Sequence, residues 1–495
     1  MSVTEQPPSL YVSREPIFPK RVSGRYRNLK WVIMIVTLGI YYVTPWLRWD
    51  RGPALPDQAV LIDLANRRFF FFFIEIWPHE FYFVAGLLIM AGLGLFLFTA
   101  ALGRVWCGYT CPQTVWVDLF ILVERWIEGD RNARIRLLRQ KWDARKARLR
   151  VTKWAIWLLI AVGTGGAWVF YFDDAPTLLV ELVTLQAPFV AYATVGLLTA
   201  TTFIFGGFMR EQVCVYMCPW PRIQAAMMDE DTITVAYRDW RGEPRGKHKK
   251  QHVRVAEETR TADAISMRDA PAMAEPGDCI DCNACVNVCP MGIDIRDGQQ
   301  LECITCALCI DACNEIMDKI GKPRGLIDYM ALTDERHEKS GQPPIPVIRH
   351  ILRPRTILYT VLWAGFGVAL LVALFIRPEI SMTVAPIRNP VYITLSDGTI
   401  RNTYDLRLRN KHGEDRPYEI TVTGDAPYTV TLEGSDNQVT EVPANSTKLQ
   451  RLYIMAAPGT PAATAERSEL TIRVEDTVSS EAAEKDAVFN GKEAR

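Results

Sequence analysis

The sequence predicts a multi-domain integral membrane protein with three kinds of structure: an α-helical membrane bundle of about five spans, a small α+β domain and a C-terminal all-β sandwich. Three observations predict this. Long apolar stretches recur along the chain, two runs of cysteine lie between residues 279 and 313, and apolar and polar residues alternate after Pro378. The 495 residues suffice for several domains, and the formal net charge of +0 argues against nucleic acid as a partner.

The changes in composition along the chain predict where each segment begins and ends. The segments are a cytoplasmic tail (1–30), four membrane helices (31–235), a charged linker (236–275), the α+β domain (276–330), a second linker (331–355), a fifth membrane helix (356–377), a sandwich on the far side of the membrane (378–478) and a disordered tail (479–495).

Five long, nearly uncharged stretches predict the membrane spans. Each approaches the ~20 residues that a helix needs to cross a bilayer. Any one of them could instead be a buried core helix, but five in one chain favour a membrane protein in contact with lipid. The stretches are Trp31–Trp46, Phe81–Leu102, Trp154–Phe172, about 187–208 and Ile357–Ile376.

The distribution of lysine and arginine predicts the orientation. Residues 20–30 and the loop 104–153 are rich in both, which places them in the cytoplasm. The loop between the third and fourth spans carries acidic residues and no basic ones, so it lies outside. The cysteine runs then face the cytoplasm and the sandwich faces the far side. The four arginines of residues 48–68 lie outside in this scheme and do not fit it.

The cysteine runs have the spacing C-x2-C-x2-C-x3-C, which is typical of a bacterial-type ferredoxin domain with two [4Fe–4S] clusters. The fourth cysteine of each run usually ligates the other cluster. This predicts one cluster on Cys279, Cys282, Cys285 and Cys313, and a second on Cys303, Cys306, Cys309 and Cys289. Zinc sites use more widely separated pairs, and disulfides are not expected in the cytoplasm. Pro290 follows the first run, whereas Asn314 follows the second.

Beyond Pro378, short alternating segments separated by turn residues predict an immunoglobulin-like sandwich without cysteine. A surface for docking a partner is its expected role. The predicted strands are Val391–Leu395, Thr403–Arg409, Tyr418–Thr423, Tyr428–Glu433, Lys448–Met455 and Ser468–Val474.

The four remaining cysteines form two C-x3-C-P pairs, each just after a predicted span. Residues four apart share a helix face, and the prolines end or open helices, so four thiols are expected to converge at one membrane depth. Soft sulfur ligands favour Cu(I). A third iron–sulfur cluster, a redox-active thiol pair and plain packing remain alternatives. The candidate copper or redox thiols are Cys107, Cys111, Cys214 and Cys218.

A histidine between carboxylates precedes the second span. Glu75, His79 and Glu80 flank Trp77 and Pro78. An interfacial structural role is the first expectation for these residues, and a site for a metal ion or a quinol is the second.

Several motifs together give a resemblance to a known family. The C-x3-C-P pairs, the stretches 218–224, 227–232 and 239–246, and the cluster cysteines resemble the CcoG/FixG/RdxA family of accessory proteins for cytochrome c oxidase assembly. The resemblance covers nearly the whole chain, including the sandwich. Membrane polyferredoxins in general share the cysteines but not the segment 239–246.

The resemblance implies a function, a location and partners. The function is a cupric reductase of the bacterial inner membrane that converts Cu(II) to Cu(I) for the cbb3-type oxidase, with the ferredoxin domain cytoplasmic and the sandwich periplasmic. Oxidase subunits or copper-delivery proteins are the implied partners. A quinol-linked electron-transfer module and a non-enzymatic assembly scaffold are the alternatives. The electron donor and the possibility of a homodimer stay open.

Overall fold

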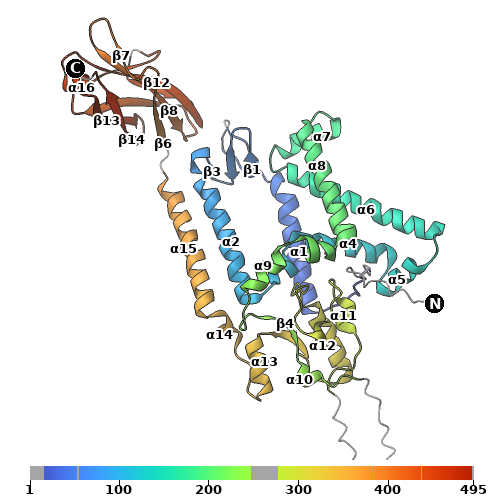
Figure 1. The fold of residues 1–495 in the computed structure, drawn as a ribbon. Coiled ribbons are helices and arrows are strands. Elements are labelled where there is room, and N and C mark those ends of the chain that lie inside the picture. The colour runs from blue at the N-terminus through green and yellow to red at the C-terminus, as the bar shows by residue number, and fades with distance from the viewer. Residues whose placement is uncertain (1–15, 53–54, 247–276, 378–379, 436, 493–495) are drawn as a thin grey trace, which may run out of the picture. The chain divides into compact units, whose positions relative to one another are not determined.

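A computed structural model describes residues 16–52, 55–246, 277–377, 380–435 and 437–492 of the chain. The chain divides into two compact units (Figure 1). Unit 1 comprises residues 1–47 and 60–368, and unit 2 comprises residues 48–59 and 369–495. Because the cysteines all lie between residues 107 and 313, every one of them belongs to unit 1.

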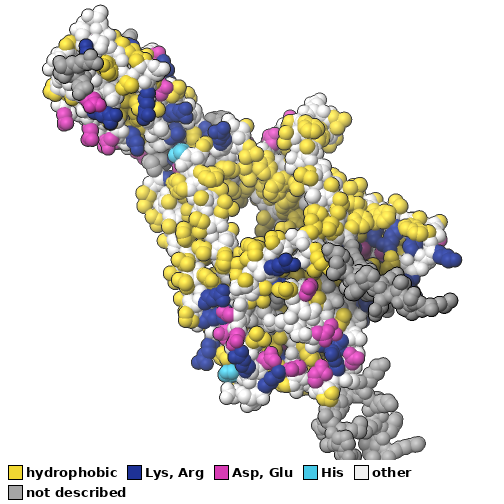
Figure 2. Space-filling view, viewed as in Figure 1, with side chains coloured by type: hydrophobic (Ala, Val, Ile, Leu, Met, Phe, Trp, Pro, Cys, Tyr) yellow, Lys and Arg dark blue, Asp and Glu magenta, His cyan; other side chains and the backbone are white. Residues whose placement is uncertain are grey.

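Four helical segments among the described residues are long and apolar enough to cross a membrane: Arg25–Trp46, Pro78–Leu102, Phe189–Met209 and Pro354–Ile376. No more than 17% of the apolar window of any of them is buried, as expected for helices that face lipid. In Figure 2 hydrophobic side chains cover this part of unit 1, and charged side chains gather over α10 to α14. The predicted span Trp154–Phe172 lies mostly in α6, which is not among the four, so a fifth span stays a prediction.

Unit 1 is mainly helical, with short helical turns and three short strands between its first two long helices. Its α-helices are α1 (Arg25–Val43), α2 (Tyr82–Leu102), α3 (Val105–Tyr109), α4 (Pro112–Glu128), α5 (Arg131–Arg139), α6 (Ala144–Val169), α7 (Ala175–Thr184), α8 (Phe189–Thr202), α9 (Trp220–Met227), α10 (Asp239–Gly242), α11 (Ala284–Val288), α12 (Leu308–Ile320), α13 (Leu332–Lys339), α14 (Val347–Ile351) and α15 (Pro354–Ile376), the last of which continues into unit 2.

Other elements complete unit 1. The π-helical stretches are η3 (Phe203–Met209) and η4 (Val213–Met217), and the 3-10 turns are η1 (Thr44–Trp46), η2 (Pro78–Glu80) and η5 (Ile295–Asp297). Strands β1 (Val60–Asp63), β2 (Arg68–Phe71) and β3 (Ile74–Ile76) form one antiparallel sheet, and β4 (Thr234–Tyr237) pairs with β5 (Ile327–Met330).

Buried ion pairs join the helices around α4. Asp118 pairs with Arg27 of α1 at 3.0 Å. Glu124 pairs with Arg134 of α5 at 3.0 Å and with Arg210, between η3 and η4, at 2.6 Å. Removing one partner of such a buried pair typically costs about 3–5 kcal/mol, because the other charge stays buried without a partner. These pairs therefore fix α4, and Cys111 at its start, relative to the membrane helices.

The ferredoxin segment is attached to the start of the first membrane helix through Asp311. This buried carboxylate of α12 accepts hydrogen bonds from the backbone N–H groups of Tyr26 (3.3 Å) and Arg27 (2.8 Å). A Cβ on Gly24 would lie 2.3 Å from the Asp311 Cγ, so the contact is close. A carboxylate at a helix N-terminus satisfies free N–H groups and complements the helix dipole.

The residues before α1 differ from the prediction of a tail over residues 1–30. Phe18 and Val22 are buried, and the N–H of Lys20 donates to the carbonyl of Asn287 at 2.7 Å. The tail prediction is therefore wrong for residues 16–30, because apolar side chains among the charges pack on the ferredoxin segment. Residues 1–15 lie outside the described residues.

Unit 2 is a sandwich of two antiparallel sheets. One sheet has the order β10-β12-β8-β6, with β7 also on β8, and the other has the order β11-β9-β13-β14. Inward residues such as Leu406, Ile420, Ile454 and Ile472 are completely buried between them. The strands are β6 (Ile380–Pro386), β7 (Ile393–Thr394), β8 (Ile400–Asn410), β9 (Arg416–Gly424), β10 (Thr429–Leu432), β11 (Val439–Val442), β12 (Ser446–Ala456), β13 (Arg467–Asp476) and β14 (Ala482–Asn490), and α16 (Pro461–Thr464) lies between β12 and β13.

The six predicted strands correspond to β7, β8, β9, β10, β12 and β13. The prediction of a disordered tail over residues 479–495 is wrong for most of that range. Residues 482–490 form β14, which pairs along its length with β13 and buries Phe489. The sequence of β14 contains few large apolar residues, so it did not show the alternation that identified the other strands. The charged linker 236–275 contains β4 and α10, and its residues from 247 onward lie outside the described residues.

We expect Asp311→Ala to lower the free energy of unfolding by about 1 kcal/mol, because two N–H groups at the start of α1 lose their acceptor. Asp311→Asn, which keeps one side-chain oxygen, should lose less. Denaturant titration in detergent, followed by tryptophan fluorescence, measures the change. Asp318→Ala is the matched control, since Asp318 lies on the same helix in an exposed pair with Arg324. Equal stability of Asp311→Ala and wild type would contradict this role.

Candidate functional site

The two cysteine runs share one unusual backbone conformation. The residues on either side of the second cysteine are left-handed in both runs: Asp281 and Asn283 have φ of 51° and 54°, and Thr305 and Ala307 have φ of 54° and 59°. None of the four is glycine, and the left-handed conformation costs such residues roughly 1–2 kcal/mol each. Strain of this kind is kept at functional sites, and turns that present successive N–H groups bind anions such as iron–sulfur clusters.

The structure brings Cys289 to the cysteines of the second run. Cys289, Cys303, Cys306 and Cys309 line one cavity, together with apolar side chains and Cys285 of the first run. Burial raises the pKa of Cys289 to about 12, and the neighbouring thiols of Cys306 and Cys303 add to this rise. We call these four residues cysteine set 2.

The fourth cysteine of the second run lies with the first run. Burial raises the pKa of Cys313 to about 12, and the nearby thiols of Cys285, Cys282 and Cys279 raise it further. We call these four residues cysteine set 1. The arrangement is the crossed one that the spacing predicts, in which each run gives its fourth cysteine to the other set.

Each set offers the four cysteines that a [4Fe–4S] cluster needs. No group of three or more His, Cys, Asp or Glu side chains in the described parts of the chain is placed to hold one metal ion. In a [4Fe–4S] cluster four cysteines bind four irons, so the sulfurs surround a volume and do not converge on a point. The cavity lined by set 2 is such a volume, and the chain fits two clusters.

Polar groups surround set 1. Arg296 lies beside the thiols of Cys279 and Cys285, and it forms ion pairs with Asp294 (2.6 Å) and Asp281 (2.7 Å). Tyr237 also lies beside Cys279, and burial is the main cause of its raised pKa. Cys282 is exposed. Set 1 therefore lies near the surface of unit 1.

The four membrane thiols lie close together, although neither pair shares one regular helix as the sequence predicted. Cys107 lies in α3, which ends at Tyr109, and Cys111 precedes Pro112, the first residue of α4. Cys214 lies in η4, and Cys218 follows its end. The proline after Cys111 opens a new helix, as expected.

Electrostatic contacts confirm that these thiols approach one another. Burial raises the pKa of Cys214 to about 12, and the thiols of Cys111, Cys107 and Cys218 contribute to the rise. Helix η3, which precedes this site, packs closely on Phe120 and Trp157 through two glycines. A Cβ on Gly206 would lie 3.2 Å from Phe120, and a Cβ on Gly207 would lie 2.9 Å from Trp157. π-helical turns of this kind often occur at functional sites.

The segment between Cys107 and Cys111 touches the loop of set 2. A Cβ on Gly108 would lie 2.5 Å from the carbonyl oxygen of Ile304 and 3.0 Å from the Cα of Cys306. The Tyr109 hydroxyl donates to the carbonyl of Cys306 at 3.2 Å. Cys107 and Cys306 belong to one buried apolar cluster, against which Cys214 and Cys289 also pack. The membrane thiols and set 2 therefore form one continuous site.

Two further residues complete this site, and the sequence did not identify them as functional. The Cys107 thiol donates to the Oε1 of Gln224, at 3.1 Å, and Gln224 is completely buried in α9. Arg104 lies three residues before Cys107 and contacts the loop of set 2. No sequence motif marks either residue, because neither Gln224 nor Arg104 belongs to a repeated or regularly spaced pattern.

The acidic residues before the second span have partners within the chain. Glu75 pairs with Arg68 at 3.2 Å. Glu80 is buried and accepts the backbone N–H of Trp77 at 3.1 Å. These contacts favour the structural role over a metal or quinol site for the group that includes His79.

Family models match most of the chain. A family described as a 4Fe-4S dicluster domain matches residues 209–332, and one described as a 4Fe-4S binding domain matches residues 83–132. A family described as an IG-like fold at the C-terminus of FixG matches residues 370–492. These matches identify iron–sulfur domains and a FixG-type sandwich.

Three curated relatives are similar over nearly their full length. Protein RdxB of Cereibacter sphaeroides is 68% identical and covers 98% of each chain. Protein RdxA of the same organism is 61% identical, over 94% of this chain and 95% of its own. Nitrogen fixation protein FixG of Rhizobium meliloti is 54% identical, over 86% of this chain and 82% of its own.

Paired substitutions test the crossed arrangement. We expect Cys289→Ser with Cys303→Ser to abolish one cluster, because both residues belong to set 2. Cys289→Ser with Cys279→Ser should impair both clusters, because the residues belong to different sets. Anaerobic iron and sulfide analysis, with EPR of the reduced protein, measures the clusters that remain. The reverse pattern would mean that each run holds its own cluster.

Proposed function

This chain belongs to the family of FixG, RdxA and RdxB, and on that premise we propose that it is a membrane iron–sulfur protein that reduces Cu(II) to Cu(I). Its iron–sulfur domains and apolar helices support electron transfer at a membrane. The proposal adds the substrate and the place of the reaction, which is the group of thiols formed by Cys107, Cys111, Cys214 and Cys218.

One observation carries the proposal: the thiol segment is in contact with set 2. When bound, the [4Fe–4S] clusters supply single electrons, which is what conversion of Cu(II) to Cu(I) requires. Cys279, Cys282, Cys285 and Cys313 would hold one cluster, and Cys289, Cys303, Cys306 and Cys309 the other. The close backbone approach at Gly108 and the hydrogen bond of the Tyr109 hydroxyl to Cys306 keep the proposed copper thiols close to set 2.

The thiols themselves favour the reduced product. Thiolates are soft ligands and select Cu(I). A site that binds Cu(I) more tightly than Cu(II) raises the effective potential of the metal and so draws the electron toward it. The reduction transfers one electron to Cu(II), which a reduced cluster would supply. Since Cys107 and Cys214 are largely buried and protonated in the free protein, copper binding releases protons.

The location and partners form part of the same proposal. In a bacterial inner membrane, with both cysteine sets in the cytoplasm, the sandwich of unit 2 would be periplasmic. We further propose that the sandwich docks cbb3-type oxidase subunits or copper-delivery proteins.

A second candidate is a third iron–sulfur group at the membrane thiols. The family described as a 4Fe-4S binding domain matches residues 83–132, a range that contains Cys107 and Cys111 but no other cysteine. Iron bound at these thiols would make them part of the electron path and leave copper to be reduced elsewhere.

We expect the reconstituted, chemically reduced protein to convert Cu(II) to Cu(I), detected with a Cu(I)-specific chromophore. Changing all four membrane cysteines to serine should reduce the rate at least tenfold, because the serine hydroxyl is a hard donor that does not select Cu(I). The variant should keep both EPR cluster signals, which controls for folding.

Each alternative has its own result in this assay. Absence of Cu(I) with wild type would remove the reductase function, and equal rates in both proteins would remove the thiol site. Loss of iron and sulfide in the serine variant would identify a third cluster. Oxidation of added quinol by the same preparation would favour a quinol-linked electron-transfer module.

A further inference from the structure

Arg104 differs from the other buried arginines of unit 1. Among the described residues the buried arginines are Arg27, Arg104 and Arg134. Arg27 pairs with Asp118 and Arg134 pairs with Glu124, each at 3.0 Å. In the described part of the chain Arg104 forms no ion pair with a carboxylate, although only 3% of its surface is exposed. A buried charge without a counter-charge is costly, so a negative group is expected beside it.

The groups that interact most strongly with the charge of Arg104 are cysteines of the functional site. Burial lowers the pKa of Arg104, and Cys107, Cys303 and Glu302 act in the opposite direction. Cys107 is one of the membrane thiols and Cys303 belongs to set 2. Four cysteine thiolates around a cluster carry net negative charge, which would supply the missing partner.

The guanidinium also joins three segments of the site through backbone carbonyls. One nitrogen donates to the carbonyl of Leu301 and makes a longer contact, 3.5 Å, with the carbonyl of Cys303. Another nitrogen donates to the carbonyl of Pro221 in α9. Arg104 itself follows α2 and precedes the first C-x3-C pair. The side chain thus ties both membrane cysteine segments to the loop of set 2.

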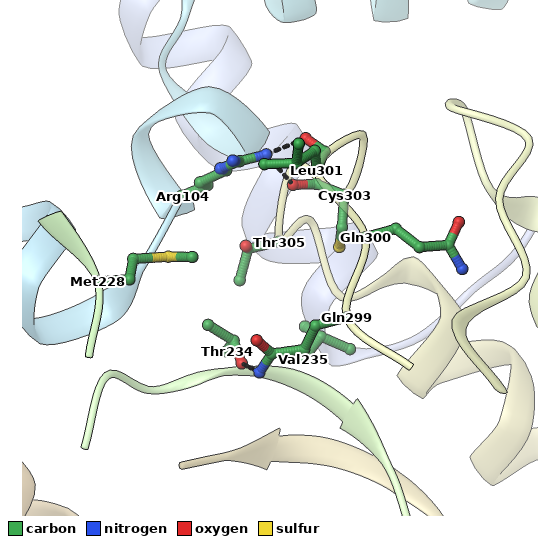
Figure 3. Close-up of a pocket in the computed structure, with 9 residues that line it drawn as sticks. All are labelled: Arg104, Met228, Thr234, Val235, Gln299, Gln300, Leu301, Cys303 and Thr305. Atoms are coloured by element: carbon green, nitrogen blue, oxygen red, sulfur yellow. Dashed lines mark hydrogen bonds between the residues drawn. The ribbon is translucent and has the colours of Figure 1, made fainter. Parts of the chain in front are cut away.

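Figure 3 shows this arrangement around a cavity of about 150 Å³. The guanidinium lies at one side of the cavity, with its contacts to Leu301 and Cys303, and the Gln299 amide donates to the Thr234 hydroxyl across from it at 2.6 Å. The other lining side chains are neutral. Arg104 is therefore the positive charge of this cavity wall.

We propose that Arg104 is a positioning residue that holds the loop of cysteine set 2 against the membrane thiols and supplies the positive charge that favours the reduced state of the cluster in set 2. A reduced cluster carries one more negative charge than the oxidised one, so a buried cation beside it raises the reduction potential. Set 1 has a corresponding cation in Arg296, which lies beside the thiols of Cys279 and Cys285.

EPR-monitored redox titration of the holoprotein tests the inference without copper. We expect Arg104→Gln to shift one of the two cluster potentials to more negative values and to leave the other in place. Arg104→Lys retains the charge and should leave both potentials close to wild type, although it loses the planar guanidinium that donates to several carbonyls. Arg296→Gln should shift the other potential, and the double variant should shift both.

Further variants control for folding. Arg104→Met removes the charge without burying an amide, and gives the same test if Arg104→Gln loses its clusters. Arg473→Gln is a control, because Arg473 pairs with Glu484 in unit 2, which contains no cysteine, and it should leave both potentials unchanged. Unchanged potentials in the Gln and Met variants of Arg104 would overturn the proposal, as would an equal shift in Arg104→Lys or a shift of the same potential by Arg296→Gln.

A second readout rests on the proposed function. The rate of Cu(I) formation should fall in both Arg104→Gln and Arg104→Lys, since each loosens the loop of set 2 from the thiols. If wild type forms no Cu(I) but the potentials shift as expected, the role of Arg104 stands and the copper function fails.

Discussion

The backbone contact between the first C-x3-C segment and the second cysteine run is the constraint on which the site depends. Gly108 lies so close to Ile304 and Cys306 that a side chain there would collide with the carbonyl oxygen of Ile304. No side chain can intervene at this point, and the membrane thiols and set 2 share one buried apolar cluster. A single-electron path between a cluster and a thiol-bound ion needs a short separation of this kind.

The rest of unit 1 maintains that contact from both sides. On the membrane side, the acidic residues of α4 pair with α1, α5 and the turn after η3, which fixes the start of α4 at Cys111. On the ferredoxin side, Asp311, which lies between Cys309 and Cys313 in the sequence, accepts a hydrogen bond from the N-terminus of α1. The backbone N–H of Lys20 donates to the carbonyl of Asn287, two residues before Cys289. The first membrane helix is therefore attached to both halves of the site. Arg104 adds a third connection through its hydrogen bonds to backbone carbonyls, and it also places a positive charge at the site.

The sequence predicted which cysteines lie together better than it predicted the backbone that holds them. Cysteine spacing alone gave both sets and their crossing, because a cluster demands ligands at fixed intervals. It could not give Gln224 or Arg104, since their roles depend on contacts between residues about a hundred or more positions apart in sequence. The C-x3-C pairs were expected on helix faces, but Pro112 starts a new helix and η4 widens to a π-helix. In unit 2, alternation predicted the central strands, whereas β6, β11 and β14 follow only from pairing with their neighbours.

A single-turnover experiment tests the central claim most directly. The protein is reduced, freed of excess reductant under anaerobic conditions and mixed with Cu(II), and the EPR signal of the reduced clusters is followed together with Cu(I). The account predicts that the cluster signal is lost as Cu(I) appears, with one electron lost for each Cu(I) formed. Cluster signals that persist unchanged in the presence of Cu(II) would contradict it.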